Sequence, residues 1–374
     1  MKKRHIEQVI GLTIDFTIDF SSNGMQQNII FLANCINSIP GRECYLIYFG
    51  DLIKNNFLRK ELCISYIDYI NKNNLKFDIV IYSGFNPGQK NHLLDKQNNK
   101  STKYVSIQYG NELVIDMQET LNGAPKKLAE IITPLDQIWT SPHYERNIPY
   151  LKTKNKNNNI KLCPYIWDDL FIKNQLTHLN INQSIENYKS GLDINRVSIF
   201  EPNLNFSKTS LLPINIVERF EQNYSNVLES CSVLSGGDRL AKNTYFLNLI
   251  LSMDIYKKRK GFLKCIGRIP FLDAISKYGG LVISHQFNNE LNYIYFEALY
   301  LSLPLIHNSD ILSNYGYYYH DCDIDKGVNW INYILDNHKN NIDQYDKNNM
   351  NLFKKYSPYS RHNIEAYKSL LDQV

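Results

Sequence analysis

Short apolar runs alternate with longer amphipathic stretches along almost the whole chain, and this alternation limits the fold more than any other feature. The pattern is typical of strand–helix–strand units, in which parallel strands form a sheet covered by helices. It occurs in two series, separated by an Asn-rich, weakly periodic segment at 168–195. No repeat with a period of about 20 to 50 residues is present, which excludes solenoids and propellers. We therefore expect two α/β domains.

The first series predicts strands at 9–16, 44–49, 79–82, 104–108, 137–140 and 161–163, and helices at 26–39 and from Ser141–Pro142 onward. The second series predicts strands at 197–201, 227–232, 263–266, 281–284 and 304–307, and helices within 207–223 and at 239–255, 270–278 and 289–301. The tail, 327–374, is predicted to be helical. These elements give an N-terminal domain at 1–165, a linker at 166–194, a C-terminal domain at 195–335 and C-terminal helices at 336–374 that can cross back to the first domain.

Composition narrows the class of protein. The 374 residues, 43% of them hydrophobic, suit two cores of ordinary size. The 41 basic and 37 acidic residues give a net charge of +4, which does not favour nucleic acid as a partner. The seven cysteines form no CxxC pair, as expected in a reducing compartment. The first apolar run is too short and too charged for a signal peptide or a membrane span. We expect a cytoplasmic protein, and peripheral association with a membrane remains open.

Polar residues gather after the strand that ends at Ser284. His285, Gln286, Asn289 and Glu290 follow it and precede an apolar helix, at a sheet edge where helix N–H groups also favour phosphate. Glu290 and Glu297 are seven residues apart, so we expect both on one helical face. A carboxylate at such a position can accept two sugar hydroxyls. The alternative is that Glu297 caps or pairs locally.

The N-terminal half offers polar residues after two strands. Asn23 and Gly24 form a predicted tight turn. Asn111 and Glu112 are a predicted acceptor contact, with Glu112 also a candidate general base, although both equally suit a turn or helix cap. The indole of Trp167 suits stacking on a sugar, or burial as an anchor.

Other motifs say less about function. His285 and His307 can act as acid or base near neutral pH. No His/Cys cluster suggests a bound metal. The sequence Asp321–Cys322–Asp323 is expected in a surface loop far from the donor contacts, and the aromatic run 315–319 in a cleft wall or an interface patch. GxSxG, P-loop and GxGxxG motifs do not occur, which argues against hydrolases, NTPases and dinucleotide oxidoreductases.

The stretch Glu297–Ile306 (EALYLSLPLI) resembles the end of the donor-binding motif of retaining GT-B glycosyltransferases, with Ser302 at the usual glycine. The resemblance implies that Glu297 holds the donor ribose. The first Glu of that motif would fall on Asn289, with Glu290 adjacent. It also implies that Lys208, after the first strand of the C-terminal half, stabilises the departing diphosphate.

A closer resemblance, to the bacterial family DUF2827, covers nearly the whole chain, although an acidic residue is usual there at the place of Asn288. The matching motifs are Asn23–Gly24 with Gln27–Asn28, Pro164–Asp168 (PYIWD), Phe200–Asn203 (FEPN) with Asn205 and Lys208, Arg239–Leu240, Gly267–Arg268, His285–Gln286, Leu291–Tyr293 (LNY) and His307–Asn308. This family is itself similar to GT-B transferases, so the resemblance implies two Rossmann-like domains facing each other across a cleft.

From these patterns we predict a metal-independent glycosyltransferase without a cofactor. It would take a UDP- or GDP-sugar as donor and a glycan or glycolipid as acceptor, as in cell-surface polysaccharide synthesis. The alternatives are a sugar-nucleotide epimerase, a non-catalytic nucleotide-sugar-binding subunit, and a transferase acting on modified phage DNA bases. The residues expected to carry catalysis are Lys208, Arg268, His285 and Glu112. Those expected to bind the donor are Asn203, Arg239, Gln286, Asn289, Glu290, Asn292, Glu297 and Gly24, and those on the acceptor side are Asn23, Asn111 and Trp167.

Overall fold

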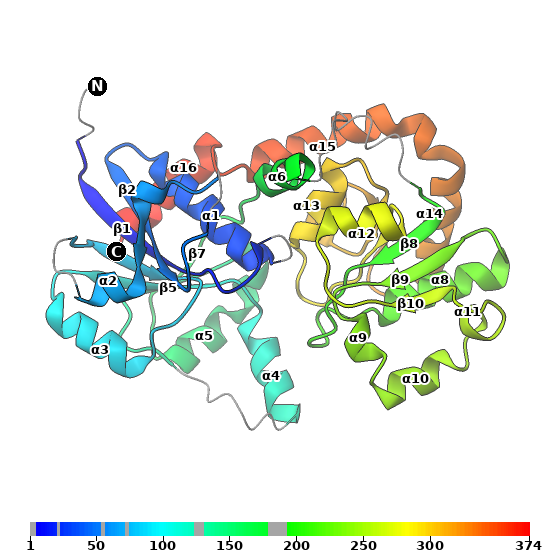
Figure 1. The fold of residues 1–374 in the computed structure, drawn as a ribbon, viewed down its shortest axis with the longest axis horizontal. Coiled ribbons are helices and arrows are strands. Elements are labelled where there is room, and N and C mark those ends of the chain that lie inside the picture. The colour runs from blue at the N-terminus through cyan, green and yellow to red at the C-terminus, as the bar shows by residue number, and fades with distance from the viewer. Residues whose placement is uncertain (1–4, 21–22, 54–56, 72–74, 123–130, 179–192) are drawn as a thin grey trace. The chain divides into compact units, whose positions relative to one another are not determined.

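The chain folds into two compact units, which are described separately here. The computed structural model describes residues 5–20, 23–53, 57–71, 75–122, 131–178 and 193–374. The N-terminal unit contains 1–168 and 354–374, and the C-terminal unit contains 169–353 (Figure 1). Part of the segment expected as a linker, 169–178, thus belongs to the C-terminal unit, and 179–192 lie outside the described residues. The last 21 residues group with the N-terminal unit.

The N-terminal unit is built on a parallel sheet. Among its described residues the sheet has seven strands in the order β3-β2-β1-β4-β5-β6-β7. The strands are β1 (Gln8–Asp15), β2 (Arg42–Phe49), β3 (Cys63–Ser65), β4 (Ile79–Tyr82), β5 (Lys103–Gln108), β6 (Gln137–Thr140) and β7 (Ile160–Leu162). The strand β1 is buried on both faces, because Ile10, Leu12 and Ile14 are fully covered and Thr13 nearly so. Helices therefore cover both sides of the sheet.

The covering helices explain the apolar and polar periodicity of the intervening segments. They are α1 (Gly24–Asn37), η2 (Lys60–Leu62), α2 (Tyr66–Asn71), α3 (Gln89–Asn98), α4 (Glu112–Asn122), η3 (Pro142–Asn147), α5 (Ile148–Asn155) and α16 (Arg361–Asp372). Helix α1 packs against β2 and α16, and Figure 1 shows α3, α4 and α5 on the opposite side of the sheet. The C-terminal helix α16 is thus part of this unit's core, with Tyr367 and Leu371 buried.

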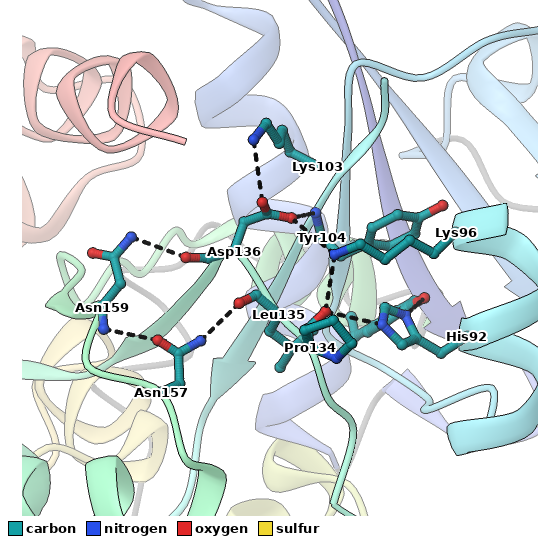
Figure 2. Close-up of polar contacts among 10 residues, drawn as sticks. His92, Lys96, Lys103, Tyr104, Pro134, Leu135, Asp136, Asn157 and Asn159 are labelled. Atoms are coloured by element: carbon teal, nitrogen blue, oxygen red, sulfur yellow. Dashed lines mark hydrogen bonds and ion pairs between the residues drawn. The ribbon is translucent and has the colours of Figure 1, made fainter. Parts of the chain in front are cut away.

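A polar cluster fastens the amino edge of this sheet, where β5, β6 and β7 begin (Figure 2). The Asp136 carboxylate accepts from the Tyr104 backbone N–H at 2.8 Å and from Lys103 Nζ at 3.2 Å. His92 Nε2 lies 3.1 Å from the Pro134 carbonyl oxygen, and burial lowers the pKa of this imidazole. Ligands of open parallel sheets bind at the opposite, carboxyl edge. The cluster is therefore structural.

The C-terminal unit repeats the architecture. Among its described residues a parallel sheet of six strands has the order β10-β9-β8-β11-β12-β13. The strands are β8 (Arg196–Ile199), β9 (Ser230–Val233), β10 (Leu263–Cys265), β11 (Leu281–Ile283), β12 (Leu305–His307) and β13 (Tyr317–Tyr318). The aromatic run 315–319 thus contains the edge strand, and Tyr317 and Tyr319 are buried in the core. The prediction that the aromatic run forms a cleft wall or an interface patch is therefore wrong for these two side chains.

The helices of this unit are α6 (Leu170–His178), α8 (Leu211–Asn223), α9 (Gly237–Leu240), α10 (Thr244–Ile250), α11 (Asp254–Lys257), α12 (Phe271–Tyr278), α13 (Tyr293–Tyr300), η4 (Asp310–Leu312), α14 (Ile324–Asn337), η5 (Lys339–Asn341) and α15 (Ile342–Tyr356), which contains the boundary between the units. Helices α8 and α14 pack together, and α12 packs on β8 and β9.

Two helix predictions are wrong in detail. The segment 239–255 forms three short helices instead of one, because Asn243 caps a new helix through the Phe246 N–H and the chain turns again before Asp254. The helix expected from Asn289 begins only at Tyr293, after the cap residue Asn292. Asn289 and Glu290 therefore lie in the loop before α13.

Asp136 provides a test of the polar cluster. Replacing Asp136 by Ala leaves the N–H of the buried Tyr104 without its acceptor, so we expect a loss of about 1–3 kcal/mol in the free energy of unfolding, measured by urea denaturation. The control is Glu61→Ala, which removes an exposed pair with Arg59 and should leave the free energy of unfolding nearly unchanged. Equal losses in the two variants would contradict a stabilising role for Asp136.

Candidate functional site

The strand order of the C-terminal unit places one ligand-binding position before any side chain is considered. Successive strands are added on one side of β8 up to β10 and on its other side from β11 onward, so the strand order reverses between the parallel neighbours β8 and β11. In open parallel sheets, ligands bind beyond the carboxyl ends of the strands at this switch point. Glu201 follows β8 there, and Ser284, His285 and Gln286 follow β11. We define these four residues, with Lys208, as the switch-point cluster.

The Glu201 carboxylate is the centre of the cluster. Its side chain is 1% exposed. Ser284 Oγ donates to one carboxylate oxygen and Gln286 Nε2 to the other. Burial raises the pKa of Glu201 to about 7, against the lowering effects of the Ser284 hydroxyl and the Lys208 charge. Sequence reasoning assigned no role to Glu201, although a carboxylate directly after a buried strand is a signal that could have found it.

The Glu201 network extends to a predicted donor-binding residue. Gln286 Oε1 accepts from Asn289 Nδ2 at 2.6 Å, so the amide of Gln286 joins Glu201 to Asn289. The Gln286 backbone is fixed as well, because its N–H donates to Asn308 Oδ1 at 2.9 Å and its carbonyl accepts from Asn308 Nδ2 at 2.9 Å. Gln286 and Asn289 are both buried. The loop after β11 is therefore held rigidly in one conformation.

Two cations converge on the same edge. Lys208 lies in the loop after β8 and forms a β-bridge with Gln286. Among the described residues, its ammonium makes no hydrogen bond or ion pair. Burial lowers the pKa of Lys208, the Glu201 charge opposes this effect, and the positive charge of Arg268 adds to it. Arg268, which is exposed, is therefore near enough to repel Lys208, and an anion between them would relieve the repulsion.

The other predicted donor contacts of this edge have different environments. Asn203 is in the left-handed region, with φ of 52°, and its side chain bonds the Glu201 carbonyl and Ser210, so it closes the Lys208 loop. Arg239 is exposed at the start of α9. A Cβ at Gly236 would lie 2.2 Å from the Pro202 carbonyl oxygen, so this glycine lets α9 approach the loop after β8.

Glu297 projects from α13 into a buried position. Its side chain is 5% exposed and, among the described residues, its carboxyl has no hydrogen-bond or ion-pair partner. Burial raises its pKa to about 8. Asn292 caps this helix through the Ile294 N–H at 3.3 Å. The prediction that Glu290 and Glu297 share a helical face is wrong, because Glu290 precedes the helix, where its carbonyl accepts from Ser309.

The two candidate histidines differ in whether both ring nitrogens have a hydrogen-bond partner. His307 is buried with both ring nitrogens engaged, one by the Tyr315 carbonyl and the other by the Ser309 N–H, and burial lowers its pKa to about 4. Burial also lowers the pKa of His285 to about 4. His285 Nδ1 lies 2.9 Å from Tyr319 Oη, whereas its Nε2 is buried with no partner among the described residues.

Asp321 lies nearer to this region than expected. Its carboxylate raises the pKa of His285 against the effect of burial, so the loop after β13 approaches the carboxyl end of β11. Asp323 caps α14 through the Lys326 N–H. The expectation that this Asp–Cys–Asp sequence is far from the donor contacts is therefore wrong for Asp321. Among the described residues, no three His, Cys, Asp or Glu side chains gather as a metal site.

The predicted residues of the N-terminal unit are largely engaged in local structure. Asn23 caps α1 through the Met25 and Gln26 N–H groups, directly before Gly24. Asn111 accepts from the Val114 N–H and from Asn147.

The remaining two residues of this unit are also engaged. Glu112 accepts from Lys154 Nζ at 2.9 Å, beside a second pair of that lysine with Asp116. Trp167 is 3% exposed, and its backbone N–H donates to the Tyr356 carbonyl. Its indole is thus a buried one.

Comparison with solved structures defines the class. The α,α-trehalose 6-phosphate synthase from Burkholderia multivorans has a TM-score of 0.57 at 10% identity, covering 99% of this chain and 96% of that chain. The lipopolysaccharide outer core galactosyltransferase WaaB has a TM-score of 0.52 at 11% identity, covering 98% and 99%. A glycosyltransferase from Rickettsia africae has a TM-score of 0.52 at 12% identity, covering 98% and 99%. The chain thus has the GT-B fold, with two Rossmann-like units.

The family is shown by the sequence itself. The model of DUF2827, a family of proteins of unknown function, matches residues 10–371, and the chain belongs to this family. Comparison with curated proteins gives no match. None of the described helices combines the length and apolar character that crossing a membrane requires.

The environment of Glu297 predicts a pH dependence of stability. Its pKa is raised from the usual 4.5 to about 8 in the folded protein, so its contribution to stability is lost as pH rises from about 4.5 through about 8. The variant Glu297→Gln cannot ionise, and we expect it to gain stability relative to the wild type by up to about 1.4 kcal/mol per pH unit across this range. Urea unfolding between pH 5 and pH 9, roughly the window set by these values, measures the difference.

The matched control for this experiment is Glu290→Gln, on the partly exposed loop before α13. Its stability difference from the wild type should change little over the same pH range. If the stability difference between Glu297→Gln and the wild type is also independent of pH, Glu297 is already ionised in the folded protein at the acid end of this range.

Proposed function

We propose that this protein is a glycosyltransferase that binds a nucleotide-sugar donor at the carboxyl edge of its C-terminal unit. The observation that carries the proposal is the convergence of Lys208 and Arg268 at the switch point of a GT-B fold. Two cations that repel each other, with one of them lacking a direct partner among the described residues, are suited to a diphosphate. Two proteins of the same fold, WaaB and the Rickettsia africae protein, are described as a galactosyltransferase and a glycosyltransferase.

Glu297 would bind the nucleoside end of the donor. A buried carboxyl without a partner carries a desolvation cost, which two hydroxyl donors of a ribose would offset. The diol would also stabilise the carboxylate form and lower its pKa. The same position carries the ribose contact implied by the resemblance of 297–306 to the GT-B motif. The predicted sugar contacts, His285, Asn289 and Glu290, lie in the loop between β11 and α13.

In the proposed reaction the bond between the anomeric carbon and the diphosphate oxygen breaks, and the electron pair leaves with that oxygen. Lys208 and Arg268 would stabilise the negative charge that develops there, because fixed cations lower the energy of a charged transition state. A hydroxyl of a glycan or glycolipid acceptor forms the new bond to the anomeric carbon, and its proton passes to the departing diphosphate oxygen. We further propose UDP- or GDP-sugars as donors, catalysis without a metal ion, and a cytoplasmic role in cell-surface polysaccharide synthesis with peripheral membrane association.

A binding role without catalysis is the second candidate, since Asn289 stands where the related motif has its first carboxylate and its amide bonds Gln286. This candidate would be favoured if a donor binds but is neither transferred to any acceptor nor hydrolysed.

Nucleotide binding is tested first. Thermal unfolding in the presence of UDP, GDP, ADP, CMP and their common sugar conjugates should show a higher melting temperature with one nucleotide class, because a ligand of the native state stabilises it. In Glu297→Ala that stabilisation should fall, since the ribose contact is lost, while the far-ultraviolet circular dichroism stays unchanged. Unchanged affinity in a folded Glu297→Ala protein would remove Glu297 from the site, and no shift with any compound would contradict the donor site.

The role of Lys208 is tested by turnover with the nucleotide-sugar that this screen identifies. We expect Lys208→Met to lower kcat by about 100- to 1,000-fold, with a smaller change in KM, because a cation on the leaving group acts mainly in the transition state. The control, Lys242→Met, removes an exposed lysine of the segment between α9 and α10 and should leave kcat unchanged. Equal kcat in the wild type and Lys208→Met would eliminate the leaving-group role.

A further inference from the structure

The imidazole of His285 has one nitrogen engaged and one without a partner. Nδ1 lies 2.9 Å from Tyr319 Oη, and Nε2 is buried without a hydrogen bond to any described residue. The side chain as a whole is 4% exposed, so solvent does not readily satisfy this nitrogen. A buried polar atom without a hydrogen bond costs about 1–3 kcal/mol. Such an atom at the carboxyl edge of the sheet is a candidate ligand contact.

The hydrogen bonds of Tyr319 favour one tautomer of His285. The Tyr319 hydroxyl lies 3.3 Å from the Ser284 carbonyl oxygen and 2.9 Å from His285 Nδ1. A phenol has a single hydrogen, so a hydroxyl that donates to Ser284 accepts from His285, which places the imidazole proton on Nδ1. At neutral pH the ring is uncharged, since burial lowers the pKa of His285 to about 4. In this tautomer Nε2 is an unprotonated acceptor.

The backbone around His285 is fixed on both sides. Ser284 N–H donates to the Ile306 carbonyl, and Phe287 N–H donates to the Ser207 carbonyl. Tyr319 is 1% exposed, and its own N–H donates to the His307 carbonyl. The ring of Phe287, an exposed side chain, lies 5.9 Å from that of His285, centroid to centroid. Phe287 thus stands beside the imidazole as an aromatic surface that is open to solvent.

We propose that His285 Nε2 accepts a hydrogen bond from a hydroxyl or amide N–H of the transferred sugar, and that Tyr319 is the positioning residue that keeps this nitrogen unprotonated. The inference rests on the proposed function and identifies the sugar class, because an uncharged lone pair binds an O–H or N–H donor and repels a carboxylate. The group at this contact is thus a hydroxyl or amide N–H of the sugar, as hexosyl and N-acetylhexosaminyl units present, and not a uronyl carboxylate.

The protonation state is measured without any ligand. In protein labelled with 15N-histidine, long-range 1H–15N correlation at pH 7 should show His285 with a protonated Nδ1 and an unprotonated Nε2, and the signals that vanish in His285→Phe give the assignment. In Tyr319→Phe the Nδ1 proton loses its acceptor, so we expect a mixture of the two tautomers. A protonated Nε2 in the wild type would overturn the proposal.

The sugar contact is measured with UDP and UDP-glucose, and with GDP and GDP-mannose, by titration calorimetry. We expect His285→Phe, which keeps an aromatic ring, to weaken the sugar nucleotide by about 3- to 10-fold and to leave the bare nucleotide unchanged, because one hydrogen bond to the sugar is lost. Tyr319→Phe should give a smaller loss of the same kind. His320→Phe, on the exposed loop after β13, is the matched control and should change neither affinity.

The outcomes separate the two proposals. Equal weakening of nucleotide and sugar nucleotide in His285→Phe would assign His285 a structural role and overturn the sugar contact, with the donor site intact. If the wild type binds neither these four compounds nor any other compound of the thermal screen, the proposed function fails and the sugar contact fails with it. The tautomer measurement still decides whether Nε2 is an acceptor.

Discussion

The buried carboxylate of Glu201 is the interaction on which the candidate site depends. It lies where β8 and β11 end side by side, and through Ser284 and Gln286 it joins the loops that follow these two strands. Without a carboxylate there, the buried Gln286 amide would lose its acceptor and the Ser284 hydroxyl would keep only Tyr295, which is costly in a region of low polarity. The negative charge of Glu201 also raises the pKa of Lys208 against the effect of burial. One side chain thus shapes the loop and favours a cation beside it.

The two edges of each sheet serve different purposes in this chain. In the N-terminal unit, the amino edge is closed by Asp136 and its neighbours (Figure 2), and most polar residues predicted at the carboxyl edge act as caps or ion pairs. In the C-terminal unit, the carboxyl edge contains Lys208, Glu297 and His285, each with an atom that no described residue satisfies. Polar groups left without partners are expensive, so their concentration at one edge is what distinguishes a ligand site from a well-capped sheet.

The sequence was sufficient for the two parallel sheets without their edge strands β3 and β13, and for the stretch that follows β11, since both depend on local apolar periodicity and on where a strand ends. The start of α13 was misplaced because Asn289 and Glu290 suit a helix equally well, and only the bond from Asn289 to Gln286 keeps them outside it. The three helices after β9 were missed because buried Phe246, Ile250 and Ile255 continue one apolar period across the breaks. The partners of Glu201 and Tyr319 could not be predicted, because they come from strands distant in sequence, although the position of Glu201 after a buried strand was a usable signal.

The hydrogen bonds that join Asn289 to Gln286 and Gln286 to Glu201 all donate in one direction, and this limits which substitutions the site can accept during evolution. A carboxylate can only accept, so Gln286 must turn its NH2 toward Glu201 and its carbonyl oxygen toward Asn289. The orientation of two amides is therefore dictated by one carboxylate that precedes Gln286 by 85 residues. An amide at position 201 offers one acceptor oxygen where the carboxylate offers two, so it could accept from Gln286 or from Ser284 but not from both. Positions 201, 284 and 286 should thus vary together during evolution, as one character and not as three.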